Sequence, residues 1–214
     1  LTLNDYKIIN LDKNLNHRIL YLSSNLNSHI RYVEFLLKSF NKDSLDQNVI
    51  HGDPKLSNFL FDVQNKYVVS LIDLDTVSSG FFLTDLADCI RSICNLAGED
   101  PQKIENVKFD INSCIYFLQG YFSLAKQEIT SSYKILPEFI YLIIFELSIR
   151  FLTDFLQSDN YFKIKYKTHN LYRAEVQSKL LSSFLTQIPL LSNELDEIGL
   201  SSSSIFVSDV QKLI

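Results

Sequence analysis

The most informative part of the chain reads VIHGDPKLSNFLFD at residues 49–62 and continues, after a short gap, with SLIDLD at residues 70–75. Short apolar runs alternate there with polar residues, which is the pattern of short strands joined by loops. We predict a small β-hairpin with strands at Phe59–Phe61 and Tyr67–Ile72 and a turn over 62–66. A polar loop precedes this hairpin, and an acidic cluster closes its second strand.

Helical spacing dominates on both sides of the hairpin. Apolar residues before it predict a helix over about 26–40. From Thr84 onward the spacing is helical again, as at Phe139, Ile143 and Leu147. The expected fold is therefore α+β and mainly helical, with one small hairpin that carries the functional loops.

Composition narrows the class of protein. The 214 residues are 46% apolar and 21% charged, which is the balance of a globular chain in water. We expect Cys89, Cys94 and Cys114 to be buried thiols in a reducing compartment, and hence a cytoplasmic protein. The formal charge of −5 argues against a nucleic-acid partner. We expect no membrane span, because charged residues interrupt the most apolar stretch, Phe139–Phe151.

The polar residues of the two quoted segments suit phosphoryl transfer. Asp53, Lys55 and Asn58 share one loop, and Asp73 closes the next strand. Phosphoryl transfer needs a carboxylate that orients and deprotonates the attacking hydroxyl, a cation beside the phosphate, and oxygen ligands for the nucleotide-bound metal. These residue types at this spacing indicate a kinase rather than an ordinary polar turn.

The ordered motifs resemble the aminoglycoside phosphotransferase and choline kinase family, which has the protein-kinase-like fold. The family hallmark is H-[GN]-D-x-x-x-x-N followed by a strand that ends in I-D, and it is present from His51 to Asn58 and at Ile72 and Asp73. Later blocks resemble the N-acetylhexosamine 1-kinases in particular: IDLDTV at 72–77, DLADCIR at 85–91, RFLTD at 150–154 and YFKIK at 161–165. The resemblance covers roughly residues 49–179.

The resemblance implies a role for each residue of the two loops. Asp53 would be the catalytic base, and Lys55 would neutralise charge on the γ-phosphate of ATP. Asn58 and Asp73 would bind Mg²⁺. Asp75 would bind a second metal or orient the first ligands, because alternate residues of an extended segment share a face. A surface or capping carboxylate is the alternative for Asp75.

Other residues would support the site or bind the acceptor. His51 would brace the catalytic loop through hydrogen bonds to nearby backbone or to the aspartate of the metal loop. Asp85 or Asp88 would be an anchor behind the loop. Arg150 and Tyr161 fall where the hexosamine kinases contact the sugar, although an ion-paired arginine and a core tyrosine are equally compatible with the sequence.

The resemblance also sets the expected domain organisation. Kinases of this fold place roughly a hundred or more residues of N-terminal lobe before the catalytic loop, whereas 48 residues precede Val49 here. We therefore expect a protein-kinase-like C-terminal lobe: a helical lead-in over 1–48 that follows a missing N-lobe, a catalytic lobe over 49–190 and a tail over 191–214. An uncovered apolar face should then promote self-association.

The expected function is ATP- and Mg²⁺-dependent transfer of the γ-phosphate to a small-molecule hydroxyl, with an N-acetylhexosamine-like sugar as the leading acceptor. Gly52 stands where the hexosamine kinases usually have asparagine, so choline, homoserine or an aminoglycoside stays open as acceptor. A non-catalytic binding module built from a C-lobe is the alternative of another class. The expected partners are a nucleotide and a sugar-like molecule, without nucleic acid or membrane.

Overall fold

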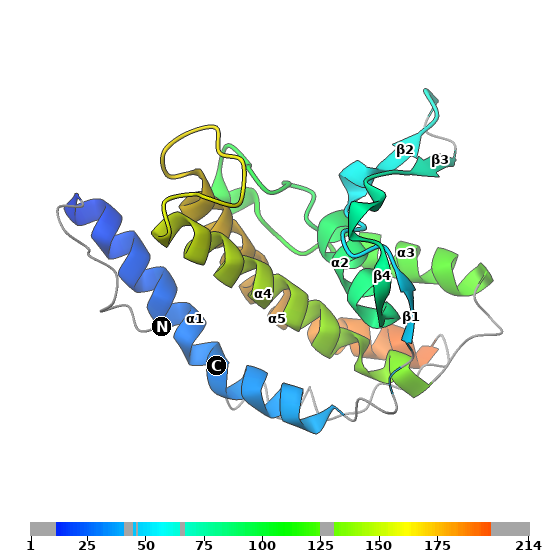
Figure 1. Ribbon diagram of the computed structural model, residues 1–214. Coiled ribbons are helices and arrows are strands. Elements are labelled where there is room, and N and C mark those ends of the chain that lie inside the picture. The colour runs from blue at the N-terminus through cyan, green and yellow to red at the C-terminus, as the bar shows by residue number, and fades with distance from the viewer. Residues whose placement is uncertain (1–11, 41–44, 46, 65–66, 125–130, 198–214) are drawn as a thin grey trace.

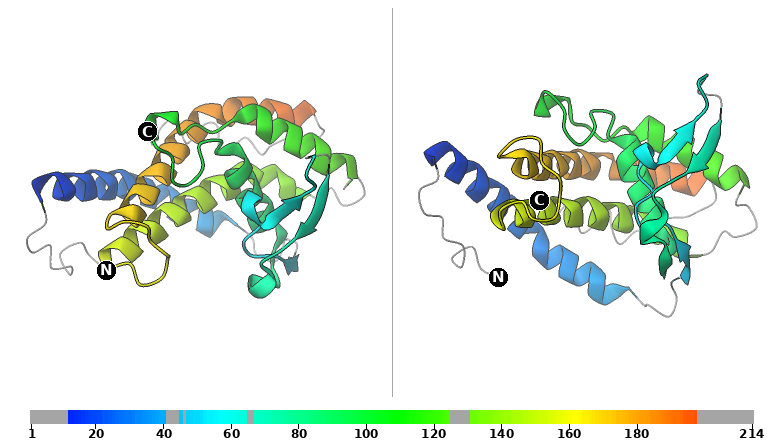
Figure 2. Two further views of the ribbon diagram at one scale, coloured as in Figure 1. Left: turned by 90° about the horizontal axis from the view of Figure 1, so that it is seen from above. Right: turned by 45° about the horizontal axis from the view of Figure 1, so that its top comes forward.

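The computed structural model describes residues 12–40, 45, 47–64, 67–124 and 131–197. Two long helices, α4 (Leu136–Leu156) and α5 (His169–Glu197), lie side by side along the centre of the molecule (Figure 1). Helix α2 (Phe82–Cys94) packs on α4, and α3 (Ile111–Leu124) contacts both α2 and α5. The views of Figure 2 show α1 (Lys13–Ser39) along the outer side of this helical body.

Two small antiparallel sheets connect α1 to α2. Strand β2 (Phe59–Phe61) pairs with β3 (Val68–Leu71), which confirms the predicted hairpin. Strand β1 (Gln47–Ile50) pairs with β4 (Ser78–Phe81). The sequence did not predict β4, because Ser-Ser-Gly lacks the β-branched residues that mark a strand. The mainly helical α+β architecture with two-stranded sheets agrees with the expected fold class.

Helix α1 is longer than the predicted helix over 26–40, because it begins at Lys13. The asparagines that made its first half look interrupted are tolerated there, since tertiary contacts outweigh weak helix propensity. Arg18 makes two hydrogen bonds to the carboxylate of Glu175 in α5, of 2.8 and 2.7 Å. The lead-in expected over 1–48 thus contains α1 and the start of β1, while residues 1–11 lie outside the described residues.

Helix α5 extends into the tail expected from residue 191. Leu191 and Leu195 are fully buried, so the helix, which ends at Glu197, packs into the core as far as Leu195. Residues 198–214 lie outside the described residues. Among the described helices, none is both long and apolar enough to cross a membrane.

The three cysteines are free and buried, as predicted. Burial raises the pKa of Cys89 to about 12. A thiol with such a pKa is protonated and unreactive near neutral pH, so Cys89 acts as a core residue.

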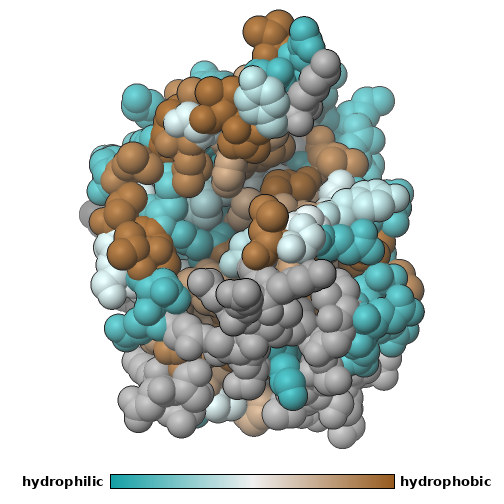
Figure 3. Space-filling model, turned by 90° about the vertical axis from the view of Figure 1, so that its right-hand side faces the viewer, coloured by the Kyte–Doolittle hydropathy of each residue, from teal (hydrophilic) through white to brown (hydrophobic). Residues whose placement is uncertain are grey.

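The hairpin exposes apolar side chains on the face shown in Figure 3, where they gather at the top beside a hollow. The most exposed apolar residues of the two sheets and of the hairpin connection are Val49, Val63, Tyr67 and Val69. Contiguous apolar surface of this kind promotes association. The expected self-association stays a prediction, and these side chains are the ones on which it depends.

A buried carboxyl at the start of α4 leads to a prediction on stability. Glu138 is 3% exposed, and its Oε2 has no hydrogen-bond partner within the described part of the chain. Burial raises the pKa of Glu138 from 4.5 to about 7. Folding therefore favours the protonated carboxyl, and the stability that it contributes at low pH is lost as the pH rises from about 4.5 to about 7.

We expect Glu138→Gln, which mimics the protonated carboxyl, to increase the free energy of unfolding by roughly 3 kcal/mol near pH 8. The gain should shrink to almost nothing near pH 4. Urea denaturation across this pH range measures it. Glu146→Gln, on the exposed side of the same helix, is the control and should show no such pH dependence. A gain for Glu138→Gln that is independent of pH would contradict the assignment.

Candidate functional site

The loop at 51–58, which we call the catalytic loop after its predicted role, follows β1 and is held in place by helix α2. The carboxylate of Asp85 accepts hydrogen bonds from the backbone N–H groups of His51, at 2.5 Å, and Gly52, at 2.9 Å. Hydrogen bonds to a charged acceptor are stronger than neutral ones. Asp85, one of the two anchors expected from the sequence, therefore holds the loop by its main chain.

Gly52 makes a turn that a larger residue would strain. Its φ is +85°, and a Cβ atom there would lie 2.7 Å from the carbonyl oxygen of Thr76. The hydroxyl of Thr76 in turn donates to the carbonyl oxygen of His51 at 2.7 Å. The close approach of these two segments explains in physical terms why glycine occupies this position.

The imidazole of His51 links the catalytic loop to the segment after β3 that leads to Asp73. We call the residues around Asp73 the metal loop, after their predicted role. Its Nε2 lies 2.9 Å from the carbonyl oxygen of Ile72, and its Nδ1 accepts from the backbone N–H of Asp53 at 3.2 Å. These contacts fit the tautomer with its proton on Nε2. His51, which is buried, makes the backbone contacts expected of a brace.

Four of the predicted site residues lie together at this point. Lys55 forms an ion pair with Asp53. The side-chain nitrogen of Asn58 lies 2.8 Å from the carbonyl oxygen of Asp53 and 3.4 Å from a carboxylate oxygen of both Asp53 and Asp73. Asn58 is buried at the end of η3 (Leu56–Asn58), so the amide is held between the two carboxylates.

The backbone turns sharply at Asp73. This residue has φ 68° and ψ 55°, in the left-handed region, and η4 (Leu74–Thr76) follows it directly. The argument that placed Asp75 on the same face as Asp73 assumed an extended segment and is wrong. Asp75 is exposed within the turn of η4.

Asn58 and Asp73 offer oxygen ligands of the kind that Mg²⁺ prefers. Magnesium in kinases usually takes one or two protein carboxylates, substrate phosphates and several waters rather than a cage made by the protein alone. Among the described residues there is no group of three or more His, Cys, Asp or Glu side chains that would form such a cage. An amide and a carboxylate on two separate loops fit a phosphate-bound magnesium ion.

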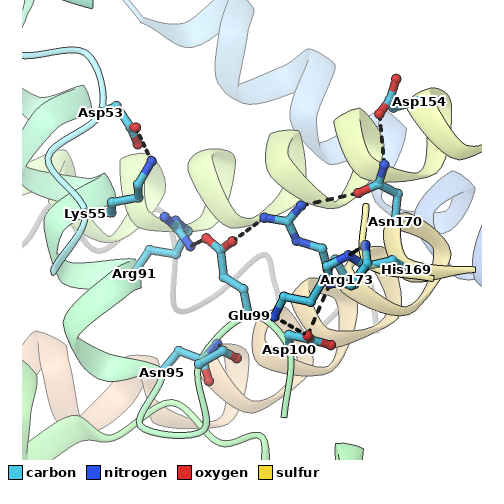
Figure 4. Close-up of polar contacts among 12 residues, drawn as sticks. Asp53, Lys55, Arg91, Asn95, Glu99, Asp100, Asp154, His169, Asn170 and Arg173 are labelled. Atoms are coloured by element: carbon cyan, nitrogen blue, oxygen red, sulfur yellow. Dashed lines mark hydrogen bonds and ion pairs between the residues drawn. The ribbon is translucent and has the colours of Figure 1, made fainter. Parts of the chain in front are cut away.

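Next to the catalytic loop lies a chain of ion pairs (Figure 4). Arg91 of α2 binds Asp88 at 2.6 Å and Glu99 at 3.4 Å, and Glu99 also binds Arg173 of α5 at 2.8 Å. Arg91 is 2% exposed. Burial alone would raise the pKa of Glu99, but Arg91 and Arg173 lower it below its ordinary value. Asp88 therefore anchors an arginine rather than the catalytic loop itself.

Asp154 shapes the loop that carries Tyr161. Its carboxylate accepts the backbone N–H groups of Tyr161, at 2.8 Å, and Phe162, at 2.9 Å, and the side chain of Asn170, at 2.9 Å. Asn170 also accepts a hydrogen bond from Arg173 at 3.3 Å. Asn170 therefore connects Asp154 to the chain of ion pairs in Figure 4.

Arg150 lies against this loop, with its guanidinium 5.6 Å from the ring centre of Tyr161 and 5.4 Å from that of Phe162. It also forms a looser ion pair with Glu146, at 3.7 Å. Tyr161 is an exposed residue rather than a core tyrosine. The ion pair that was the alternative interpretation of Arg150 is thus present together with the ring contacts.

One cavity of about 440 Å³ brings the two ends of the site together. Its walls include Asp53 and Lys55 at one end and Arg150 and Tyr161 at the other. We call it the polar cavity. A second, more open cavity of about 870 Å³ lies toward the hairpin, and we call it the hairpin cavity. The two share four charged residues: Lys55, Arg91, Glu99 and Arg173.

The sequence did not predict a role for Glu99 or Arg173. Arg91 belongs to the DLADCIR motif at 85–91. Glu99 instead follows Gly98 in a loop, and Arg173 lies on α5, far along the chain. Their contact forms only when α5 lies beside the loop at 95–101. A carboxylate directly after Gly98 was the only local signal, and it predicts a turn rather than a site.

Residues 13–106 match the family model APH, the phosphotransferase enzyme family. The matched residues span α1, both sheets and α2, and they include both the catalytic and the metal loop. Arg150, Tyr161 and Arg173 lie outside the match. The match makes these loops similar to those of phosphotransferases, and it does not identify the acceptor.

Proposed function

We propose that this chain carries the catalytic loops of an ATP-dependent kinase that phosphorylates a hydroxyl of a neutral, sugar-like small molecule in the polar cavity. The observation that carries the proposal is the convergence of Asp53, Lys55, Asn58 and Asp73 beside that cavity. The family match over the same loops supports phosphotransfer.

The residues would act mainly by position and charge. Asp53 lines the cavity, so it can accept the proton of an acceptor hydroxyl and orient that hydroxyl for attack. Lys55, now paired with Asp53, carries the cation that would shift toward a transferring phosphate. Asn58 and Asp73 would hold Mg²⁺, which supplies charge neutralisation on the phosphates when it is bound. His51 and Asp85 keep the loop in place.

The cavity disfavours choline as acceptor. A quaternary ammonium binds in a cage of free aromatic faces. Here arginines already occupy the rings: Arg150 lies over Tyr161 and Phe162, and Arg173 lies over Phe151 at 4.1 Å and over Phe162 at 5.6 Å. A second cation would meet two guanidinium groups.

The same balance of charge disfavours an aminoglycoside. A polycationic acceptor needs carboxylates that lack a partner. In the polar cavity Asp53 pairs with Lys55, Asp88 and Glu99 pair with arginines, and Asp85 binds two backbone N–H groups. A neutral acceptor rich in hydroxyls, such as an N-acetylhexosamine, fits these groups best.

A screen for ADP release tests the proposal. The complete gene product that contains these residues is incubated with ATP, Mg²⁺ and one of N-acetylglucosamine, N-acetylgalactosamine, choline, homoserine or kanamycin. We expect turnover with a sugar and its loss when EDTA removes the metal. Preferred turnover of choline or kanamycin would refute the proposed acceptor class. ATP binding without turnover of any acceptor would favour a binding module.

A further inference from the structure

We infer that Glu99 recognises the acceptor: together with Arg173 it binds two adjacent hydroxyl groups, and so selects a polyol. This inference rests on the proposed function and names a specificity-determining residue for the same cavity. Glu99 touches no residue of the catalytic loop by a hydrogen bond or ion pair among the described contacts, so its role is separate from that of Asp53.

Glu99 has unused hydrogen-bonding capacity that faces the cavities. A carboxylate accepts about four hydrogen bonds. Glu99 makes one short contact, to Arg173, and one long contact of 3.4 Å, to Arg91. Its side chain is 31% exposed and lines both the polar and the hairpin cavity. Glu99 therefore keeps hydrogen-bond acceptor capacity at a wall that a ligand in either cavity would contact.

Arg173 supplies donors next to these acceptors. Its guanidinium uses one nitrogen for Glu99 and another for Asn170, which leaves some of its five N–H groups free. Stacking over Phe151 fixes the plane of the guanidinium. Of two neighbouring hydroxyls, one can donate to the carboxylate while the other accepts from the guanidinium. A quaternary ammonium has no N–H or O–H to donate.

The loop that carries Glu99 is held rigidly enough for such recognition. The next residue, Asp100, binds Lys165 and the hydroxyl of Tyr166, each at 2.9 Å. Arg91 fixes Glu99 from α2, and Arg173 fixes it from α5 (Figure 4). A carboxylate held by two arginines, on a loop that its neighbour Asp100 also ties down, loses little freedom when a ligand binds, which favours affinity.

A second Glu–Arg pair provides the matched control. Glu175 lies two residues after Arg173 on α5 and makes two short hydrogen bonds to Arg18. Neither residue lines the polar or the hairpin cavity. Glu175→Gln therefore removes a charge from the same helix region without touching the ligand site.

Calorimetry with sugars tests the inference without phosphotransfer. The complete gene product is titrated, in the absence of ATP, with N-acetylglucosamine and with its 3-deoxy and 4-deoxy analogues. We expect Glu99→Gln to weaken binding of the parent sugar about tenfold or more, since a hydrogen bond to a charged group is lost. One deoxy analogue should bind the wild type and the variant equally. Glu175→Gln should bind all three sugars as the wild type does.

Kinetics separate recognition from a structural role. Glu99→Gln should raise the KM for the sugar and change kcat little, because the contact exists in ground and transition state alike. Glu99→Asp, which keeps the charge, should recover part of the affinity. Thermal unfolding verifies that both variants fold.

Three outcomes overturn the inference: a wild type that binds none of the sugars, a variant that weakens all three equally, or a variant that changes none. The screen for ADP release decides the proposed function separately. Sugar binding that depends on Glu99 without ADP release would leave the inference standing and refute the kinase. ADP release with a sugar that is unchanged by Glu99→Gln would support the kinase and refute the inference about Glu99.

Discussion

Asp53→Asn should lower kcat by about 10²- to 10⁴-fold, the usual contribution of a general base. Asparagine has nearly the same shape but cannot take the proton of the acceptor hydroxyl. The side chain of Asp53 is 32% exposed at the edge of the polar cavity and pairs with Lys55. Its loss therefore removes little packing, and the free energy of unfolding should change by less than about 1 kcal/mol.

ADP release by the complete gene product measures the loss of turnover, and urea denaturation measures the stability. Asp75→Asn is the matched control, because Asp75 is an exposed carboxylate close by in sequence, in the turn of η4. We expect the control to keep most of its activity. Near-normal turnover of Asp53→Asn would refute its assignment as the base.

Asp85→Ala should reduce both stability and activity. The substitution leaves the backbone N–H groups of His51 and Gly52 without their carboxylate acceptor. Each hydrogen bond to a charged group is worth about 1.5–3 kcal/mol, so we expect roughly 3–6 kcal/mol of destabilisation in total. Because the same bonds position Asp53, kcat should fall as well.

Denaturation and ADP release on the same preparation measure both effects. Asp110→Ala is the control, since Asp110 accepts a backbone N–H at the start of α3, from Ser113 at 3.0 Å, away from the cavity. It should lose stability without a fall in kcat. Asp85→Ala with unchanged kcat would show that the loop keeps its geometry without α2.

The sequence predicted the hairpin and the loops on either side of it because their signals are local. Short apolar runs bounded by polar residues mark β2 and β3, and the spacing of Asp53, Lys55 and Asn58 places them in one loop. Asp73 lies near these residues because the hairpin is short: its antiparallel strands bring the residue after β3 close to the residue before β2.

Other features could not be predicted from the sequence, because they depend on contacts between elements that are far apart in the chain. Strand β4 forms from small residues only because β1 lies beside it. The pairing of Glu99 with Arg173 requires α5 to lie beside the loop at 95–101. The turn at Asp73 needed a backbone conformation that aspartate rarely adopts, so an extended segment was the natural but wrong expectation for Asp75.

The hydrogen bonds from the catalytic loop to Asp85 determine how this region opens. Since the amides of His51 and Gly52 are tied to α2, they exchange with solvent only when that helix or its start unravels. The hairpin beyond Asn58 has few such ties to the helical body and can fluctuate on its own. We therefore expect the catalytic loop to open together with α2 and with the segment at 72–76, to both of which it is hydrogen-bonded.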